Sequence, residues 1–252
     1  MEPILKVTDL SKSFSRAGKN EFFAVDHVSF AVMPGEILGI VGESGSGKST
    51  IAKLITRQID ATGGRIELAG QDITKLKGRS LIPVYAKIQM VFQAPTGSFD
   101  PRRTLGDGIC ESLRNKGVPK AEREEKARRL LEQCGLSGDF LERYPHQVSG
   151  GQCQRAAIAR ALMCDPQVLI FDEATSALDV TVQKQIIDLL QQLQEEKKLA
   201  YLFICHNLAL VQQFCDKIIV LYDGKIVESG LPDEVILHPQ SKYAKRLVDA
   251  IF

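Results

Sequence analysis

A glycine-rich stretch near the start of the chain constrains the fold more than any other feature. Residues 42–49 read Gly-Glu-Ser-Gly-Ser-Gly-Lys-Ser, which matches the phosphate-loop pattern of glycine, four free positions, glycine, lysine and serine. The apolar run Ile37–Val41 precedes the loop, and Ile51, Leu54 and Ile55 follow it at helical spacing. The sequence therefore predicts a buried strand, a glycine loop and a helix in direct succession.

This loop predicts a site for the phosphates of a nucleoside triphosphate. Its glycines let successive backbone N–H groups surround phosphate oxygens, and the helix that follows adds the positive end of its dipole. We expect Lys48 to bring charge to the β- and γ-phosphates and Ser49 to ligate Mg²⁺. A chance match in an ordinary turn is the alternative, and the flanking strand and helix argue against it. The residues expected at the nucleotide here are Gly42, Glu43, Ser44, Gly45, Ser46, Gly47, Lys48, Ser49 and Thr50.

Composition narrows the class of protein. A chain of 252 residues with 44% hydrophobic and 25% charged residues is typical of a soluble globular protein of one large or two small domains. Its formal net charge is +1 without blocks of like charge, so nucleic acid and anionic lipid are not favoured partners. No apolar run reaches the length of a membrane span, and no signal-peptide pattern is present. The six cysteines lack metal-ligand spacing, which suits a reducing cytosol.

Three later apolar runs, at residues 88–92, 168–172 and 201–205, are interpreted as buried strands. Polar side chains lie at or just after their carboxyl ends: Gln93, then Asp172 with Glu173, then His206. Taken alone, the acids would ordinarily be solvated residues at a strand end, and the histidine would ordinarily be structural. Beside a phosphate loop, however, ligands gather at this edge of a parallel sheet. We expect one acid to hold Mg²⁺ and its neighbour to polarise an attacking water.

The remaining segments predict two additions to this core. Residues 4–10, 24–32 and 65–68 resemble strands of an antiparallel layer, with a break expected at Gly63-Gly64, and Asp223-Gly224 predicts a hairpin. Residues 94–165 are interpreted as an inserted helical subdomain, in which Ala127, Leu130, Leu131 and Cys134 share one helix face. The predicted fold is α/β, a single P-loop NTPase domain over residues 1–252. Its mainly parallel nucleotide-binding core is formed by residues 1–93 and 166–252.

A second anion site is predicted inside the helical segment. Ser149 has the chemistry of an N-cap, and Gly150-Gly151 precede a helix pattern that runs from Cys153 to Met163. The N-terminus of such a helix binds anions when no side chain covers it. A purely structural cap is the alternative reading of so short a string.

The order of these motifs resembles that of the ATP-binding subunits of ABC transporters over essentially the whole chain. The resemblance assigns the Walker A loop to residues 42–49, the Q-loop glutamine to Gln93 and the family signature to residues 149–152. It assigns Walker B to residues 168–172 and the catalytic glutamate to Glu173. It makes Asp179 the D-loop aspartate and His206 the switch histidine. Phe14 falls at the position of the aromatic residue that stacks on adenine, and Phe22 and Phe23 are rivals. The sequence departs from the family at Val148, where leucine is usual, and at Asn207, where aspartate is usual.

The resemblance implies a mechanism. Two ATPase subunits, identical or different, close head to tail around two ATP molecules, so that each ATP meets Ser149, Gly150, Gly151 and Gln152 of the other subunit. Ser49, Asp172 and Gln93 are the expected Mg²⁺ residues. The expected catalytic residues are Glu173, which deprotonates the attacking water, His206 at the γ-phosphate, Gln93 and Lys48, while Asp179 also lies at the nucleotide.

The resemblance also implies partners and a cargo. Residues 93–104, 41–44 and 238–243 are similar to the peptide and nickel importer branch. The expected function is therefore ATP-driven import of peptides, nickel or a metal chelate, at the cytoplasmic face of the cell membrane. The expected partners are transmembrane permease subunits, which dock near Pro95, Phe99 and Leu105, and indirectly an extracytoplasmic substrate-binding protein. The alternatives are a soluble ABC ATPase that acts on nucleic acid or ribosomes, and an exporter subunit.

Overall fold

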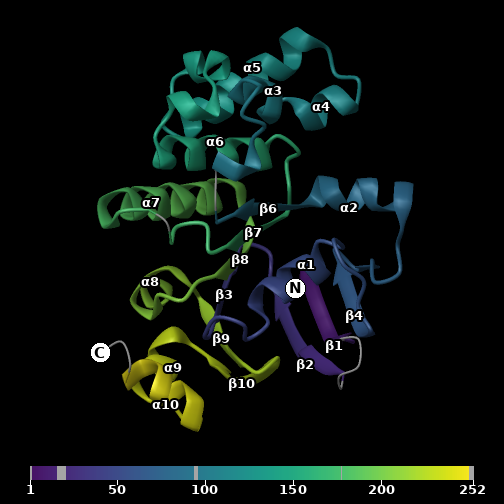
Figure 1. Cartoon of the computed structure of the whole chain (residues 1–252), viewed down its shortest axis with the longest axis vertical. Coiled ribbons are helices and arrows are strands. Elements are labelled where there is room, and N and C mark those ends of the chain that lie inside the picture. The colour runs from purple at the N-terminus through teal and green to yellow at the C-terminus, as the bar shows by residue number, and fades with distance from the viewer. Residues whose placement is uncertain (1, 16–20, 94–95, 177, 250–252) are drawn as a thin grey trace.

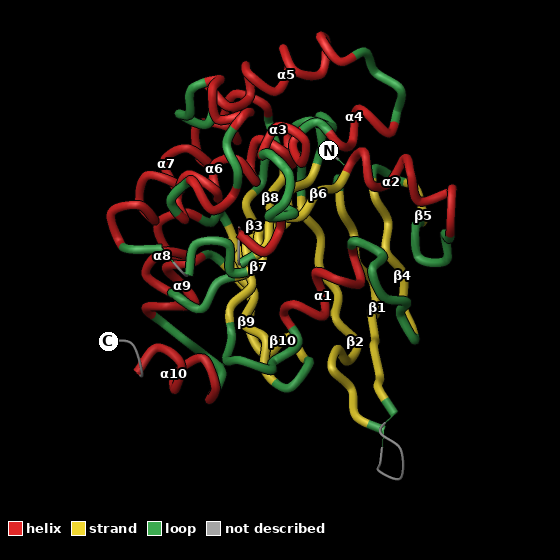
Figure 2. The backbone as a smooth tube through the Cα atoms, turned by 45° about the horizontal axis from the view of Figure 1, so that its top comes forward, coloured by secondary structure: helices red, strands yellow, loops and turns green. Residues whose placement is uncertain are grey.

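The computed structural model describes residues 2–15, 21–93, 96–176 and 178–249, which form two sheets and a cap of helices. In Figure 1 the helices α3 (Leu105–Ile109), α4 (Glu111–Asn115), α5 (Lys120–Gln133) and α6 (Gly150–Leu162) gather at one end. The strands lie in the middle, and α9 (Pro232–Leu237) and α10 (Lys242–Asp249) lie at the opposite end. Figure 2 shows the antiparallel strands β1, β2 and β4 beside the strands of the other sheet.

The larger sheet is mainly parallel, as predicted. Within the described residues it has six strands in the order β10-β9-β3-β8-β7-β6, and only the β9–β10 pair is antiparallel. The strands are β3 (Ile37–Val41), β6 (Ile88–Phe92), β7 (Val168–Asp172), β8 (Ala200–Ile204), β9 (Lys217–Tyr222) and β10 (Lys225–Gly230). The carboxyl ends of β3, β6, β7 and β8 therefore lie along one edge, where the polar residues that follow them meet.

The smaller sheet confirms the antiparallel layer and corrects one detail. Its described strands, in the order β2-β1-β4-β5, are β1 (Leu5–Phe14), β2 (Phe22–Val32), β4 (Gly63–Leu68) and β5 (Gln71–Asp72). The expected break at Gly63-Gly64 is wrong, because both glycines belong to β4. Gly64 has φ +85°, and a Cβ there would lie 2.3 Å from the carbonyl oxygen of Asp9. Glycine is needed at this position because β4 passes close to β1 where the pairing register of the two strands shifts, between Thr8 and Ser11.

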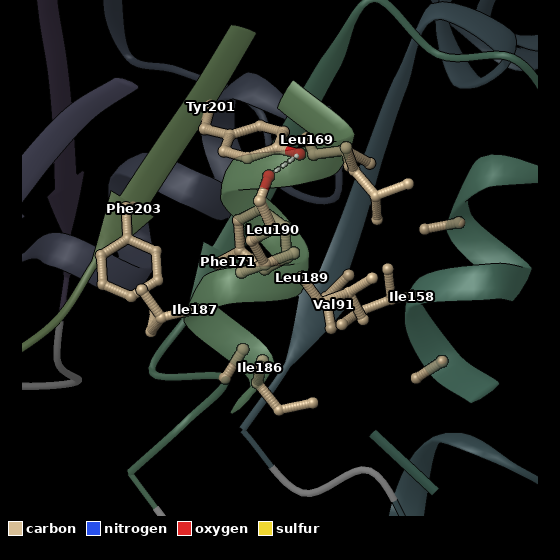
Figure 3. Packing of buried hydrophobic residues seen from close by; sticks show 14 of the residues in the cluster. Val91, Ile158, Leu169, Phe171, Ile186, Ile187, Leu189, Leu190, Tyr201 and Phe203 are labelled. Carbon is tan, nitrogen blue, oxygen red and sulfur yellow. Dashed lines mark hydrogen bonds between the residues drawn. The ribbon is translucent and has the colours of Figure 1, made fainter. Parts of the chain in front are cut away.

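Alternate residues of the central strands enter two different cores. In β7, Leu169 and Phe171 face one core while Val168 and Ile170 face the other. Figure 3 shows the first core, where Phe171 and Tyr201 meet edge to face at 5.1 Å between ring centroids. The Tyr201 hydroxyl there donates to the Leu190 carbonyl at 3.0 Å. Burial on both faces explains why these strands are continuous apolar runs.

Helices cover both faces of the larger sheet and form the cap. They are α1 (Lys48–Ile55), α2 (Ile82–Lys87), α3 (Leu105–Ile109), α4 (Glu111–Asn115), α5 (Lys120–Gln133), α6 (Gly150–Leu162), α7 (Val180–Lys197), α8 (Leu208–Phe214), α9 (Pro232–Leu237) and α10 (Lys242–Asp249). The predicted apolar face of α5 is buried, at Ala127, Leu130 and Leu131. Among the described residues, no helix is both long and apolar enough to span a bilayer.

The expectation that a permease docks near Phe99 and Leu105 needs one correction: neither side chain is itself exposed for docking. Their exposed fractions are 4% and 0%, and both belong to the larger core. The ring of Phe99 lies 4.6 Å from the guanidinium of Arg160, and it packs so closely on Gly108 that a Cβ there would lie 2.7 Å from the ring. Pro95, named with them, lies outside the described residues. The boundaries of the helical subdomain stay a prediction.

Candidate nucleotide site

The phosphate loop runs from β3 into α1, as predicted, and neighbouring backbone encloses it. Gly42 and Gly47 have φ +151° and +107°. A Cβ at Gly42 would lie 2.2 Å from the carbonyl oxygen of Leu221, and one at Gly47 would lie 2.2 Å from that of Ala24. Only glycine fits at these two positions, because the loop passes directly against the ends of other strands.

The hairpin between β9 and β10 supports the loop. Asp223 and Gly224 have φ +47° and +75°, as expected for a two-residue hairpin turn. The N–H of Gly224 donates to the Ser46 carbonyl at 3.0 Å, and its carbonyl accepts from the N–H of Asp26 at 2.9 Å. The turn thus joins the phosphate loop to β2 across almost the whole length of the chain.

Lys48 is buried within the loop, with 5% of its surface exposed. Burial lowers the pKa of its ammonium group, and the carboxylates of Glu173 and Asp172 oppose that shift. The group donates to three acceptors of the loop: the carbonyl oxygens of Gly42 (2.7 Å) and Glu43 (2.7 Å) and Ser46 Oγ (3.4 Å). These are ordinary acceptors that a phosphate anion can replace, so Lys48 is placed to bind one.

Ser49 and Asp172 meet at the carboxyl edge of the sheet. The Ser49 hydroxyl donates to Asp172 Oδ1 at 2.9 Å. Burial raises the pKa of Asp172, the hydrogen bond from Ser49 opposes the shift, and nearby Glu173 adds to it. A hydroxyl and a carboxylate beside a phosphate loop are the oxygen ligands that Mg²⁺ prefers, so this pair fits that ion.

Glu173 follows β7 in a left-handed backbone conformation, at φ +51°. Its N–H donates to the Ile204 carbonyl at 3.0 Å, and its carbonyl accepts from the Ser176 hydroxyl at 2.9 Å. The Gln93 side-chain amide donates to the same Ser176 oxygen at 3.2 Å. Ser176 therefore joins the predicted residues Gln93 and Glu173. Sequence reasoning did not single it out, because a serine in a short connection carries no motif.

The loop and Glu173 line a cavity of about 270 Å³. Its lining is Phe14, Phe22, Ala24, Ser44, Gly45, Gly47, Lys48, Ser49, Thr50 and Glu173. The rings of Phe14 and Phe22 stack at 5.8 Å between centroids. Phe23 is as exposed as Phe22, at 45%, yet it is not part of the described lining. Two of the three candidate aromatics thus form a single wall.

The second predicted anion site is built as a capped helix start. Ser149 Oγ accepts from the N–H of Gln152 at 3.2 Å, and Gln152 Oε1 accepts from the N–H of Ser149 at 2.9 Å. This capping box confirms the N-cap, and α6 begins at Gly150, earlier than the expected Cys153. None of residues 149–152 lines the described cavity. The structure does not bring them to the phosphate loop of the same chain.

Two further predicted residues lie at helix starts. Asp179 caps α7 by accepting from the N–H of Val182 at 2.9 Å. Asn207 caps α8 by accepting from the N–H of Leu210 at 3.1 Å. Asparagine caps a helix as well as aspartate does, so this departure from the family pattern retains the cap. His206 is exposed between β8 and α8 and is not part of the described cavity lining.

A protein-family model matches the part of the chain that contains the phosphate loop and the acidic end of β7. The family model described as "ABC transporter" matches residues 25–176. The chain is 45% identical to the oligopeptide transport ATP-binding protein OppF of Streptococcus mutans, over 98% of this chain and 81% of that protein. It is 42% identical to OppF of Salmonella typhimurium, over 98% and 77%. It is 45% identical to the glutathione import ATP-binding protein GsiA of Shigella dysenteriae, over 99% of this chain and 41% of that one.

Solved structures agree with these relatives. One is the dimeric ATP-binding cassette MJ0796 in a post-hydrolysis state bound to ADP and Pi, with a TM-score of 0.82 and 29% sequence identity. The match covers 90% of this chain and 98% of the MJ0796 chain. Another is cbiO1 from Clostridium perfringens, part of the ABC transporter complex cbiONQ, with a TM-score of 0.84 and 27% sequence identity. That match covers 99% of this chain and 96% of the cbiO1 chain. Both resemble this chain over nearly its full length.

Proposed function

The chain belongs to the ABC transporter family, and from this membership we propose that it is the ATP-hydrolysing subunit of a membrane importer. The observation that carries the proposal is the set of Lys48, Ser49, Asp172 and Glu173 around one phosphate loop, joined by the 2.9 Å contact between Ser49 and Asp172. The relatives named above import oligopeptides or glutathione, which favours a peptide cargo over nickel or a metal chelate. Nothing in them favours a soluble ATPase that acts on nucleic acid or ribosomes.

In this proposal the residues of the cavity divide the work. Lys48 exchanges the carbonyl oxygens of Gly42 and Glu43 for oxygens of the β- and γ-phosphates. Glu173 orients the attacking water and accepts its proton, as a general base must. Phosphoryl transfer depends mainly on positioning and charge stabilisation, which the loop amides and Lys48 supply.

Ser49 and Asp172 are the proposed Mg²⁺ ligands, and Gln93 follows Phe92, which pairs with Asp172 across β6 and β7. When bound, this ion would neutralise charge on the β- and γ-phosphates. Gln93 donates to Ser176, which in turn donates to the Glu173 carbonyl. A change at Gln93 therefore has a short physical route to the proposed general base.

The position of the signature residues 149–152 supports a proposed head-to-tail dimer. The cap occupies the N–H of Gln152, and the first helical bond of α6 runs from the N–H of Cys153 to the Ser149 carbonyl. The N–H groups of Gly150 and Gly151 precede that bond, where a helix has no internal acceptors for them. Since these residues lie away from their own cavity, we propose that they bind the ATP held by a second, identical or related subunit.

The proposed permease contact is a groove between the larger sheet and the cap, which replaces Phe99 and Leu105. The groove measures about 430 Å³, and its lining includes Tyr85, Met90 and Phe92. Tyr85 and Phe92 are 41% and 39% exposed. Phe92 directly precedes Gln93, so a permease seated here would act on the residue next to the site. We propose that this contact holds the chain at the cytoplasmic face of the membrane. A substrate-binding protein on the far side is part of the same proposal.

The proposal is tested by purification and turnover together. The chain, isolated from native membranes, is expected to bring permease proteins with it and to hydrolyse MgATP. Lys48→Ala should abolish hydrolysis. Lys184→Ala, which replaces an exposed lysine of α7, is the control and should leave hydrolysis unchanged. Turnover that survives Lys48→Ala, or co-purification of ribosomes in place of permeases, would contradict the proposal.

A further inference from the structure

The C-terminal helix contacts the phosphate loop through one side chain. Tyr243 of α10 is buried, with 6% of its surface exposed. Its hydroxyl accepts a hydrogen bond of 2.9 Å from the backbone N–H of Glu43, a residue 200 positions earlier in the chain. No motif of the site includes this tyrosine, yet it touches the loop itself.

The same residue of the loop is held on its other side by Lys48. The carbonyl of Glu43 accepts from the Lys48 ammonium group at 2.7 Å. Glu43 therefore lies in a hydrogen-bonded series that runs from the Tyr243 hydroxyl through its own backbone to Lys48. Anything that shifts the N–H end of Glu43 also shifts an acceptor of the charge that meets the phosphates.

Tyr243 is itself fixed, so its hydroxyl is a firm point of attachment. Its ring packs on that of Tyr222, with 4.2 Å between centroids. Tyr222 is the last residue of β9, and the turn that follows it donates to the carbonyl of Ser46 in the same loop. The approach to α10 is held by Glu228, whose carboxylate accepts from the N–H groups of Gln240 and Ser241 at 2.8 Å each.

We propose that Tyr243 is a positioning residue for ATP: its hydroxyl fixes the Glu43 end of the phosphate loop and thereby links helix α10 to Lys48. A loop already held in one conformation loses less freedom when the nucleotide binds, so the link strengthens binding. The main effect is on binding, because Tyr243 does not line the described cavity and the Lys48 ammonium group is itself kept when the tyrosine hydroxyl is removed. This inference rests on the proposed ATP-binding function.

The test compares Tyr243→Phe with Tyr222→Phe. Each variant loses one hydroxyl and keeps its ring, but only the Tyr243 hydroxyl has a hydrogen-bond partner among the described residues. Loss of one such bond should raise the Kd and the KM for MgATP about three- to tenfold in Tyr243→Phe, with kcat nearly unchanged. Tyr222→Phe should match the parent in all three quantities.

Two further measurements separate positioning from general damage. Amide hydrogen exchange should become faster at residues 42–47 in Tyr243→Phe and stay unchanged in β3. Glu43→Pro removes the same bond from the donor side, so Tyr243→Phe added to it should weaken MgATP binding no further. This second variant also serves if Tyr243→Phe does not fold.

The outcomes distinguish this inference from the proposed function. Parental MgATP affinity in Tyr243→Phe, an equal loss in Tyr222→Phe, or full additivity with Glu43→Pro would overturn the role of Tyr243. Failure of the parent to bind MgATP, or parental binding by Lys48→Ala, would instead overturn the ATP site itself.

Discussion

Ser49 Oγ lies 2.9 Å from Asp172 Oδ1, although 123 positions separate the two residues. The contact joins the first residues of α1 to the carboxyl end of β7, so the phosphate loop and the acidic strand end form one site. Glu173 comes directly after this contact, and its backbone is held by Ile204 and Ser176. The arrangement places the Ser49 hydroxyl and the carboxylates of Asp172 and Glu173 near the buried charge of Lys48.

The aromatic wall predicts how the base is held. Phe14→Ala and Phe22→Ala should each weaken ATP binding about tenfold, because stacking on a base contributes roughly 1–3 kcal/mol. Phe23→Ala is the matched control, since Phe23 and Phe22 are equally exposed and Phe23 is not part of the described cavity lining. Equilibrium titration with ATP measures all three. If only Phe23→Ala lost ATP affinity, the adenine base would instead stack on the other face of β2.

The groove predicts where the permease binds. Tyr85→Glu should abolish co-purification of permease proteins and transport while ATP affinity stays at the parental value, because the side chain is exposed and does not line the described nucleotide cavity. Leu237→Glu, at an apolar residue that is 61% exposed on α9, is the control and should bind normally. Permease binding that survives Tyr85→Glu would exclude this groove as the contact.

The buried position of Phe99 predicts the opposite behaviour. Phe99→Glu should yield insoluble or unfolded protein, because it removes a buried ring that packs on Gly108 and takes a carboxylate out of water. An ion pair with the nearby Arg160 guanidinium would not restore the lost packing. Soluble expression and the thermal unfolding temperature measure this effect. A folded Phe99→Glu protein that loses only permease binding would restore the docking role that the structure contradicts.

Substitutions of Asn207 distinguish its role as a helix cap from the effect of a charge at this position. Asn207→Ala should lower the free energy of unfolding by about 1 kcal/mol, because it removes the cap of α8. That loss corresponds to roughly 2–4 °C in the unfolding temperature of a chain of this size. Asn207→Asp keeps a capping oxygen and should unfold at the parental temperature. Equal destabilisation by both variants would show that the cap is not what this residue contributes.

The sequence predicts the parts of the molecule that depend on local pattern. The phosphate loop, the buried strands and the Asp223-Gly224 turn could be predicted because their residues are close together in the chain. Gly64 was interpreted as a break because the need for glycine there comes from Asp9 in another strand. The burial of Phe99 could not be predicted, because the residues that pack on its ring are Gly108 of α3 and Arg160 of α6.

The site itself shows the same limit. The residues of known motifs could be named, and the structure brings Gln93, Asp172 and Glu173 to one edge of the sheet. Ser176 and Tyr243 could not be named, because each acts through a hydrogen bond to a residue far away in the chain. Only the folded structure pairs their hydroxyl groups with the loop and the strand end.

The most direct test of the central claim is the ATPase rate and the assembly state of Glu173→Gln. The amide keeps the size of the side chain but cannot accept a proton from water, while Ser49 and Asp172 remain in place. MgATP should still bind, and hydrolysis should fall at least about a hundredfold, in line with the loss of a general base. Light scattering after size-exclusion chromatography, with the related subunit added if needed, should then show a dimer that persists only with MgATP, since ATP favours the closed form. Hydrolysis at the parental rate in Glu173→Gln would contradict the account.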